Sequence, residues 1–225
     1  MIKGKFYAVG VGPGDPDLIS LKAIKTIEKC DVIALPVSGG KNNMALDIGK
    51  PYITNQELLH LDMPMIKDGE KLRKFHRKAA DTIGSLLDEG RNVAFLTLGD
   101  PTVYSTVMYV HKFLTDDGHF TEVIPGITSF CAGAAALNIT LCEKDEMLHI
   151  VPATFTDLKQ LESLPGTKVL MKSGKTIGKV IEEFRDSNAM LVENATMKNQ
   201  RIFKDLSEIK EDTGYFSLVY LKDEK

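Results

Sequence analysis

Hydrophobic positions in the first half of the chain alternate between short continuous runs and spacings of three to four residues. The continuous runs predict buried strands at residues 6–11, 31–35, 57–61, 92–98 and 121–124. The wider spacing predicts helices between them, from Asp15 past Ile27, over 70–90 and over 103–114. Strands that alternate with helices indicate an α/β domain with a mostly parallel sheet covered on both faces.

The second half of the chain has a different pattern. It opens with a helix of small residues at 129–138, which fits close approach of another backbone or packing within the chain. Strand candidates follow at 147–151, 168–171, 189–193, 201–205 and 215–221, with helices at 156–163 and 176–185. We place a domain boundary near Pro125, giving domains of residues 1–124 and 125–225, and expect them to pack closely because no low-complexity linker separates them.

Composition and charge exclude several classes of protein. The 225 residues are 43% hydrophobic, which is ordinary for a globular chain and unlike a disordered one. With a net charge of −3, we do not expect the protein to bind nucleic acid through its overall charge. The three cysteines form no C-x-x-C pair and the five histidines no i, i+4 pair, so we expect reduced thiols and no protein-bound metal.

Hydropathy predicts no membrane segment. The most apolar stretch, residues 132–141, falls far short of the ~20 residues that span a bilayer. The first residues run into a predicted strand and lack the apolar core of a signal peptide. We therefore expect a cytoplasmic protein with no membrane partner.

Glycine and proline follow three of the predicted strands, in the segments 10–15, 99–101 and 125–129. The carboxyl ends of parallel strands share one edge of the sheet, so these loops predict a binding cleft there. The first loop is not a dinucleotide fingerprint, because its glycines are spaced G-x-G-x-G and Asp15 adds a negative charge. We interpret it as a tight turn that also lines the cleft.

A basic run lies on the predicted helix 70–90. On the simplest interpretation it is a solvated helix face, and the alternative is a contact surface for a polyanionic substrate. Its members are Lys71, Arg73, Lys74, His76, Arg77 and Lys78.

Four motifs in order along the chain resemble the tetrapyrrole methylase family. They are the segments 7–16, 98–101, 124–129 and 192–196. Within that family, residues 94–106 and 122–130, with Leu35-Pro36-Val37, are similar to the C-20 methyltransferases of the corrin (vitamin B12) pathway. The resemblance runs in register over essentially the whole chain.

The resemblance implies a two-domain α/β fold with a mostly parallel five-stranded sheet in the N-terminal domain and a mixed five-stranded sheet in the C-terminal domain. It implies transfer of a methyl group from S-adenosylmethionine to carbon 20 of precorrin-2 or its cobalt-loaded form, cobalt-factor II (cobalt-precorrin-2). The cofactor is expected between the two domains, in a homodimer without a protein-bound metal. Any cobalt arrives in the substrate.

Cofactor-binding positions carried over from the family are Pro13, Leu98, Gly99, Asp100, Val103, Thr128, Ser129, Met171 and Ala195. Substrate-cleft positions are Gly12, Gly14, Asp15, Pro36 and Tyr104. Ala195 stands where the family usually has glycine, a change that should be tolerated if the contact is made through backbone groups. Glycine and proline turns suit such a site because they bring N–H and C=O groups close to a ligand.

The proton acceptor stays open. In the related uroporphyrinogen-III methyltransferases an aspartate proposed for this role ends the second strand, where this chain has Pro36. Candidates in the cleft are Asp15, Asp100 and Tyr104. The substrate's rim carries carboxylates, for which the candidate partners are Lys41, Arg73, Arg77 and Lys172.

Three alternatives remain at this stage. The chain could methylate another substrate of the superfamily: another tetrapyrrole position, the diphthamide precursor on a translation factor, or a ribose in ribosomal RNA. It could bind a tetrapyrrole without catalysis, in which case it would not consume S-adenosylmethionine. A nicotinamide-dependent oxidoreductase is the third and weakest alternative.

Overall fold

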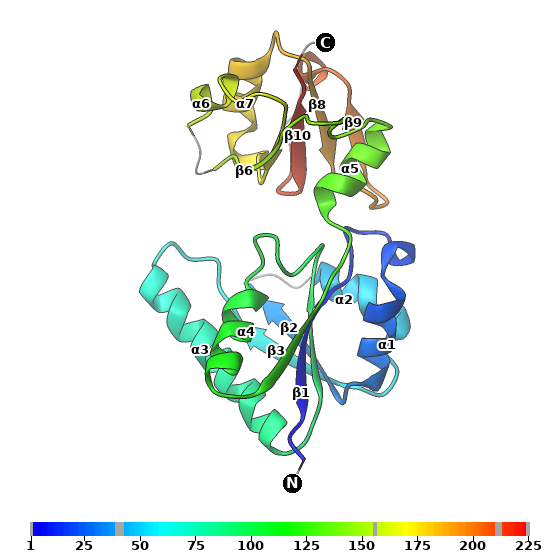
Figure 1. Ribbon diagram of the computed structural model, residues 1–225, viewed down its shortest axis with the longest axis vertical. Coiled ribbons are helices and arrows are strands. Elements are labelled where there is room, and N and C mark those ends of the chain that lie inside the picture. Colours follow the sequence, from blue (N-terminus) through cyan, green and yellow to red (C-terminus); the bar gives the residue numbers. More distant parts are fainter. Residues whose placement is uncertain (1, 39–42, 155–156, 210–212, 224–225) are drawn as a thin grey trace. The chain divides into compact units, whose positions relative to one another are not determined.

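The computed structural model describes residues 2–38, 43–154, 157–209 and 213–223. The chain divides into two compact units, Met1–Thr128 and Ser129–Lys225, each built around one five-stranded sheet (Figure 1). No helix among the described residues is both long enough and apolar enough to cross a membrane.

The sheet of the first unit is entirely parallel, which confirms the predicted fold class. Its spatial order is β3-β2-β4-β1-β5, so the first strand lies inside the sheet, flanked by the fourth and fifth. The strands are β1 (Lys5–Gly10), β2 (Val32–Val37), β3 (Glu57–Asp62), β4 (Val93–Thr97) and β5 (Phe120–Ile124).

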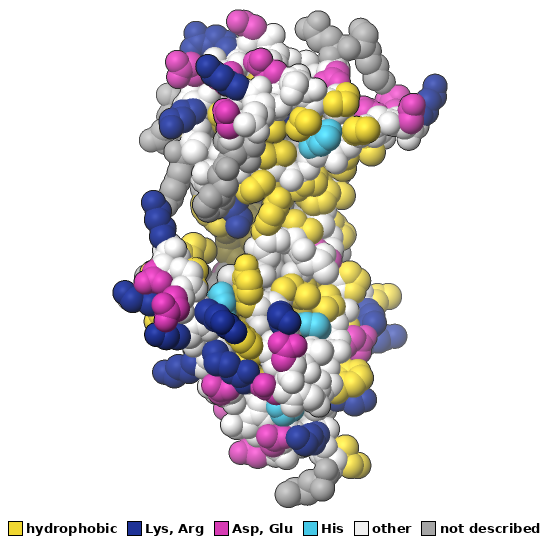
Figure 2. Space-filling model, turned by 60° about the vertical axis from the view of Figure 1, so that its left-hand side comes forward, with side chains coloured by type: hydrophobic (Ala, Val, Ile, Leu, Met, Phe, Trp, Pro, Cys, Tyr) yellow, Lys and Arg dark blue, Asp and Glu magenta, His cyan; other side chains and the backbone are white. Residues whose placement is uncertain are grey.

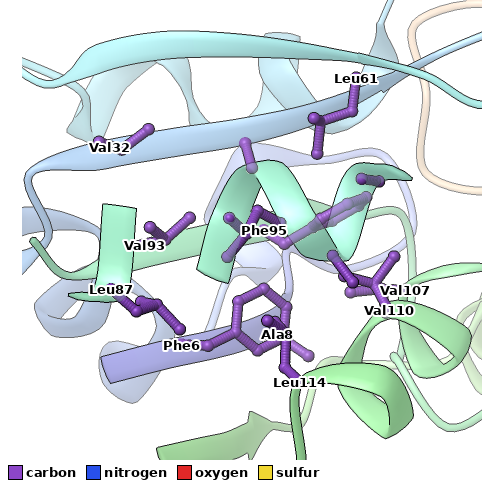
Figure 3. Close-up of a cluster of buried hydrophobic side chains, with 14 of the residues drawn as sticks. Phe6, Ala8, Val32, Leu61, Leu87, Val93, Phe95, Val107, Val110 and Leu114 are labelled. Atoms are coloured by element: carbon purple, nitrogen blue, oxygen red, sulfur yellow. The ribbon is translucent and has the colours of Figure 1, made fainter. Parts of the chain in front are cut away.

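Helices cover both faces of this sheet (Figure 1). The helices α3 (Gly69–Asp88) and α4 (Val107–Asp116) pack on one face, against alternate strand residues such as Phe6 and Phe95 (Figure 3). The helices α1 (Leu21–Lys29) and α2 (Met44–Gly49) pack on the other face. Because both faces are buried, the strands are apolar at every position rather than at alternate ones.

The predicted single helix starting at Asp15 is wrong. Asp15 caps only a short 3-10 helix, Pro16–Leu18, by accepting a hydrogen bond from the Asp17 N–H at 2.9 Å. The backbone then becomes extended, and α1 begins after Ser20, whose hydroxyl accepts from the Ala23 N–H at 3.1 Å. Leu21 opens the new helix and is 74% exposed.

Helix α4 also starts later than the predicted residue 103. A turn occupies this segment, and Tyr104 has a φ of +49°, in the left-handed region that an α-helix cannot contain. Helix α3 matches its prediction closely and is capped by Asp68, whose carboxylate accepts from the N–H groups of Glu70 and Lys71.

Strand β2 runs through Pro36, where the sequence predicted a stop. Its pairing with β3 continues to Val37, whereas its pairing with β4 ends at Ala34. The Val32 N–H points toward the β4 side, so by alternation the Pro36 nitrogen does too. A proline fits here because β4 no longer requires a hydrogen-bond donor.

The sheet of the second unit is mixed, as expected. Its order is β6-β7-β10-β8-β9; β6 and β7 pair in parallel, and the other pairs are antiparallel. The strands are β6 (Leu148–Pro152), β7 (Thr167–Met171), β8 (Ala189–Glu193), β9 (Arg201–Phe203) and β10 (Ser217–Leu221).

Helix α5 (Ser129–Leu137) covers one face of this sheet, and α6 (Lys159–Glu162) and α7 (Ile177–Phe184) cover the other. Helix α6 is shorter than predicted, and Thr156 of that prediction lies outside the described residues. The small residues of α5 fit within their own unit: a Cβ on Gly133 would lie 2.1 Å from the Tyr220 hydroxyl oxygen. Close packing of this helix against its sheet therefore accounts for the glycine.

Candidate functional site

The order of the strands in the first unit places a topological switch point at their carboxyl edge. Neighbouring strands β1 and β4 lead to helices on opposite faces, β1 to α1 and β4 to α4. Beyond these two strands the chain therefore leaves toward opposite faces of the sheet. In open parallel sheets this is the point where ligands bind.

The loops after β1 and β4 are joined by their backbones. The Gly99 N–H donates to the Gly12 carbonyl at 2.7 Å, and the Gly12 N–H donates to the Gly99 carbonyl at 3.3 Å. Both glycines have positive φ values, +85° for Gly12 and +71° for Gly99, which residues with a side chain rarely adopt. The predicted cleft glycine and the predicted cofactor glycine are thus neighbours.

The loop after β5 joins the same cluster through Asp100. One oxygen of this carboxylate accepts from the Gly126 N–H at 2.9 Å, and the other accepts from the Thr102 N–H at 2.8 Å. Asp100 is only 9% exposed. Since both oxygens already accept backbone hydrogen bonds, its geometry favours holding the loops over accepting a proton.

The remaining predicted positions of the first unit lie on these loops or at the same edge. Pro13 is buried, and Gly14 and Asp15 are half-buried beyond it. Leu98 and Val103 are half-buried on the loop after β4, and Tyr104 on that loop is 47% exposed. Pro36 is half-buried at the end of β2, and its carbonyl accepts from the Asn43 side chain at 2.9 Å.

Thr128 has the most informative side chain of the third loop. Its hydroxyl oxygen is buried and has no hydrogen-bond partner within the described part of the chain. A buried, unsatisfied hydroxyl is costly, which makes it a good position for a polar group of a ligand. Ser129 follows it as the first residue of α5.

The two predicted residues of the second unit also lie at one sheet edge. Strands β7 and β8 flank β10 and are both antiparallel to it, so their carboxyl ends point the same way. Met171 ends β7, and Ala195 follows β8 by two residues. Both belong to the cluster beneath α5.

The turn after β8 has an unusual backbone. Asn194 and Thr196 have φ values of +52° and +67°, and such left-handed values for a β-branched residue are outliers that cluster at functional sites. Ala195 between them is 4% exposed. Its methyl group is thus accommodated in the core of the unit.

Sequence reasoning passed over Glu193, which supports this turn. Its carboxylate accepts from the Arg201 guanidinium and the Gly214 N–H. Burial of Glu193 opposes ionisation, yet these two hydrogen bonds outweigh it, so the pKa of this carboxyl is lowered. The signal in the sequence was its place in the 192–196 motif, directly before the Asn-Ala-Thr turn.

The basic run on α3 is largely neutralised by its neighbours. Lys71 pairs with Asp68 at 3.6 Å and Lys74 with Glu70 at 3.3 Å, while Arg77 binds Asp81 and Asp117. On the face of the first unit seen in Figure 2, basic and acidic side chains are interspersed. This favours the solvated-face interpretation.

The structure says less about the other two residues predicted to bind substrate carboxylates. Lys172 is half-buried with a φ of +59°, at the end of β7, and Lys41 lies outside the described residues. Within the described ranges, no three His, Cys, Asp or Glu side chains are grouped as metal ligands.

Comparison with known proteins identifies relatives over the whole chain. The model of the Tetrapyrrole (Corrin/Porphyrin) Methylases matches residues 5–210. A probable cobalt-precorrin-2 C(20)-methyltransferase of Methanocaldococcus jannaschii is 40% identical, covering 97% of this chain and 96% of that protein. A precorrin-2 C(20)-methyltransferase of a Sinorhizobium species is 31% identical, with coverages of 96% and 94%.

Solved structures share the fold. A cobalt precorrin-4 methyltransferase superposes with a TM-score of 0.78 at 24% identity, covering 97% of this chain and 94% of that one. A uroporphyrin-III C-methyltransferase of Thermus thermophilus, complexed with S-adenosylhomocysteine, has a TM-score of 0.70 at 22% identity, with coverages of 97% and 92%.

Proposed function

Because this chain belongs to the Tetrapyrrole (Corrin/Porphyrin) Methylases, we propose that it methylates carbon 20 of precorrin-2 or of its cobalt-loaded form during cobalamin biosynthesis. The observation that carries this proposal is the 40% identity, over 97% of the chain, with a probable cobalt-precorrin-2 C(20)-methyltransferase. The Sinorhizobium relative is named for the metal-free substrate, so the metal state is left to experiment.

We propose that S-adenosylmethionine is the methyl donor. The buried, unpartnered Thr128 hydroxyl supports this, as do the glycine loops whose backbone groups lie at the ligand edge of the sheet. When bound, this cofactor supplies a methyl group already activated by its sulfonium charge. The residues proposed to hold it are Pro13, Leu98, Gly99, Asp100, Val103, Thr128 and Ser129 of the first unit, with Met171 and Ala195 of the second.

The chain's own contribution is mainly positioning. Asp100 fixes the loops after β4 and β5 relative to each other, and the Gly12–Gly99 pair fixes the loop after β1. Holding two reactants in line can supply ~7–11 kcal/mol of a barrier without a strong base. A group must still accept the proton that leaves the methylated carbon, and we propose Asp15 or Tyr104, which lie on the loops after β1 and β4.

The test is anaerobic incubation of the full chain with methyl-labelled S-adenosylmethionine and either precorrin-2 or its cobalt complex. Mass spectrometry detects the label, and NMR assigns the labelled carbon. Label at carbon 20 of one substrate supports the proposal and selects the metal state. Cofactor binding without label on either substrate would contradict it and favour another superfamily substrate or a non-catalytic binder.

We further propose a cytoplasmic homodimer. Both points rest on the resemblance to the family. Sedimentation equilibrium of the full chain tests the homodimer, because a single species of 24.8 kDa would contradict it.

A further inference from the structure

An imidazole on α3 has no role in the site described so far. His76 is 5% exposed, and its Nε2 atom has no hydrogen-bond partner among the residues that the structure describes. Its ring stacks on that of Tyr109, with ring centres 4.8 Å apart and planes 9° from parallel. A buried nitrogen without a partner calls for an explanation, because leaving it so costs stability.

Tyr109 belongs to the first turn of α4, which places His76 beside that helix end. The residue before the helix, Thr106, makes no side-chain cap, although the Tyr109 N–H donates to its carbonyl at 3.1 Å. By contrast, the N-terminus of α3 is capped by Asp68. Uncapped helix N-termini attract anions through their backbone N–H groups and the helix dipole.

His76 and the first turn of α4 lie near the carboxyl edge of the sheet, where the glycine loops are. Helices α3 and α4 each follow a parallel strand, β3 and β4, so both begin at the carboxyl edge. They cover the face to which Ala34 and Phe95 belong, and by alternation Pro36 and Thr97 belong to the same face at the strand ends. The imidazole is therefore on the side of the sheet where the predicted cleft residue Pro36 ends β2.

The charged side chains near His76 and the first turn of α4 favour binding of an anion. The acidic residues at the start of α3, Asp68 and Glu70, are paired with Lys71 and Lys74. The Arg73 guanidinium lies 5.8 Å from the centre of the Phe113 ring on α4, one turn beyond Tyr109. The nearby Arg77 is bound to Asp81 and Asp117, whereas Arg73 adds a positive charge beside α4.

We propose that His76 and the first turn of α4 form a subsite for one carboxylate arm of the tetrapyrrole, with Tyr109 as its movable cover. The inference rests on the proposed function, because the substrate supplies the carboxylate. The Nε2–H of the imidazole donates to the carboxylate oxygen. Tyr109 is 59% exposed, so its ring has room to turn aside when the arm enters. Burial lowers the pKa of His76, which favours the neutral imidazole.

The first experiment compares two substitutions in the full chain. His76→Phe keeps the stacked ring but removes the donor, and should raise KM for the tetrapyrrole about tenfold while kcat stays the same. His76→Gln restores an N–H donor and should recover much of the loss. His111→Phe, at a half-buried imidazole on α4, is the matched control and should leave KM unchanged. An unchanged KM in His76→Phe would overturn the subsite.

Two controls separate a structural role from binding. The affinity for S-adenosylhomocysteine and the melting temperature of His76→Phe should match those of the wild type. If the substituted chains do not fold, 15N NMR of wild-type histidines replaces them. Addition of uroporphyrin III, a carboxylate-rich porphyrin, should then shift the Nε2 resonance of His76, and an unmoved resonance would overturn the proposal.

The subsite and the proposed function can fail separately. If the wild type methylates neither precorrin-2 nor its cobalt complex, the proposed function fails. Titration with uroporphyrin III then decides the subsite by itself. About tenfold weaker binding to His76→Phe than to the wild type would support it, and equal binding would reject it.

Discussion

At the residue scale, glycine is required at positions 10 and 126 by neighbouring backbone and not by an unusual φ. A Cβ on Gly10 would lie 2.6 Å from the Gly99 carbonyl oxygen and 2.7 Å from the Gly126 nitrogen. A Cβ on Gly126 would lie 2.2 Å from that same carbonyl oxygen. Three loops thus touch through their main chains, which is why their sequences are so rich in glycine.

Gly126→Ala should destabilise the first unit by about 1–3 kcal/mol, because the loops must separate to admit the methyl group. It should also weaken S-adenosylhomocysteine binding. Thermal unfolding and calorimetric titration measure the two effects. Gly178→Ala on α7 is the control, since its Cβ meets nothing within 4 Å, and it should stabilise the chain by about 1 kcal/mol.

Asp100→Asn should lower the free energy of unfolding by about 1–3 kcal/mol. The amide that replaces one oxygen cannot accept from both the Gly126 and the Thr102 N–H groups, so one buried donor loses its partner. Denaturant unfolding measures this loss. A variant as stable as the wild type, with unchanged cofactor affinity, would contradict the role of Asp100 in joining the loops.

At the element scale, two contacts shape the second unit. The carboxylate of Glu193 at the end of β8 holds Arg201 of β9 and the Gly214 N–H before β10. Tyr220 of β10 donates its hydroxyl to the Phe130 carbonyl of α5 at 2.9 Å. Together they position the Asn194–Thr196 turn and the helix that covers it.

Low pH should remove the stabilisation that the ionised Glu193 carboxylate gives to the folded chain. Because its pKa is lowered in the folded chain, its stabilisation is complete above the unfolded value of about 4.3 and is lost as pH falls through the folded value. The difference in melting temperature between the wild type and Glu193→Gln should be constant near pH 7 and shrink below about pH 4. A difference that does not vary with pH would exclude this role for the ionised carboxylate.

The packing of α5 is testable with a double-mutant cycle. Gly133→Ala should destabilise the chain by about 1–3 kcal/mol, because the added carbon lies 2.1 Å from the Tyr220 hydroxyl oxygen. Tyr220→Phe alone should cost about 1 kcal/mol through its lost hydrogen bond. The double variant should be less destabilised than the sum of the two, since the clashing oxygen is gone; strict additivity in urea unfolding would argue against this contact.

At the scale of the whole molecule, the proposed cofactor residues come from both units. The loops after β1, β4 and β5 carry most of them, whereas Met171 and Ala195 lie at the ends of β7 and β8. One ligand that binds both sets would link the stabilities of two separately packed cores.

Hydrogen exchange with and without S-adenosylhomocysteine tests whether one ligand binds residues of both units. The ligand should slow exchange in residues 98–103 of the first unit and in residues 194–196 of the second. Residues 81–88 of α3 serve as the internal reference and should not respond. Protection confined to one unit would contradict the proposed set of cofactor residues.

The sequence by itself determined the features that depend on local order along the chain. Apolar runs and helical spacing predicted the strands and α3, because burial on both faces of a sheet requires a continuous apolar run and burial of one helix face leaves a helical period. The glycine clusters predicted loops at strand ends, and four motifs in order indicated the family that the model over residues 5–210 matches.

Only the tertiary structure decided what depends on distant partners. Pro36 stays in β2 because β4 stops pairing at Ala34, and α1 starts late because Ser20 offers a second cap. Asp100 meets Gly126, and His76 meets Tyr109, across 26 and 33 residues of chain. Such contacts leave no period or spacing in the sequence, because folding, and not local preference, brings their members together.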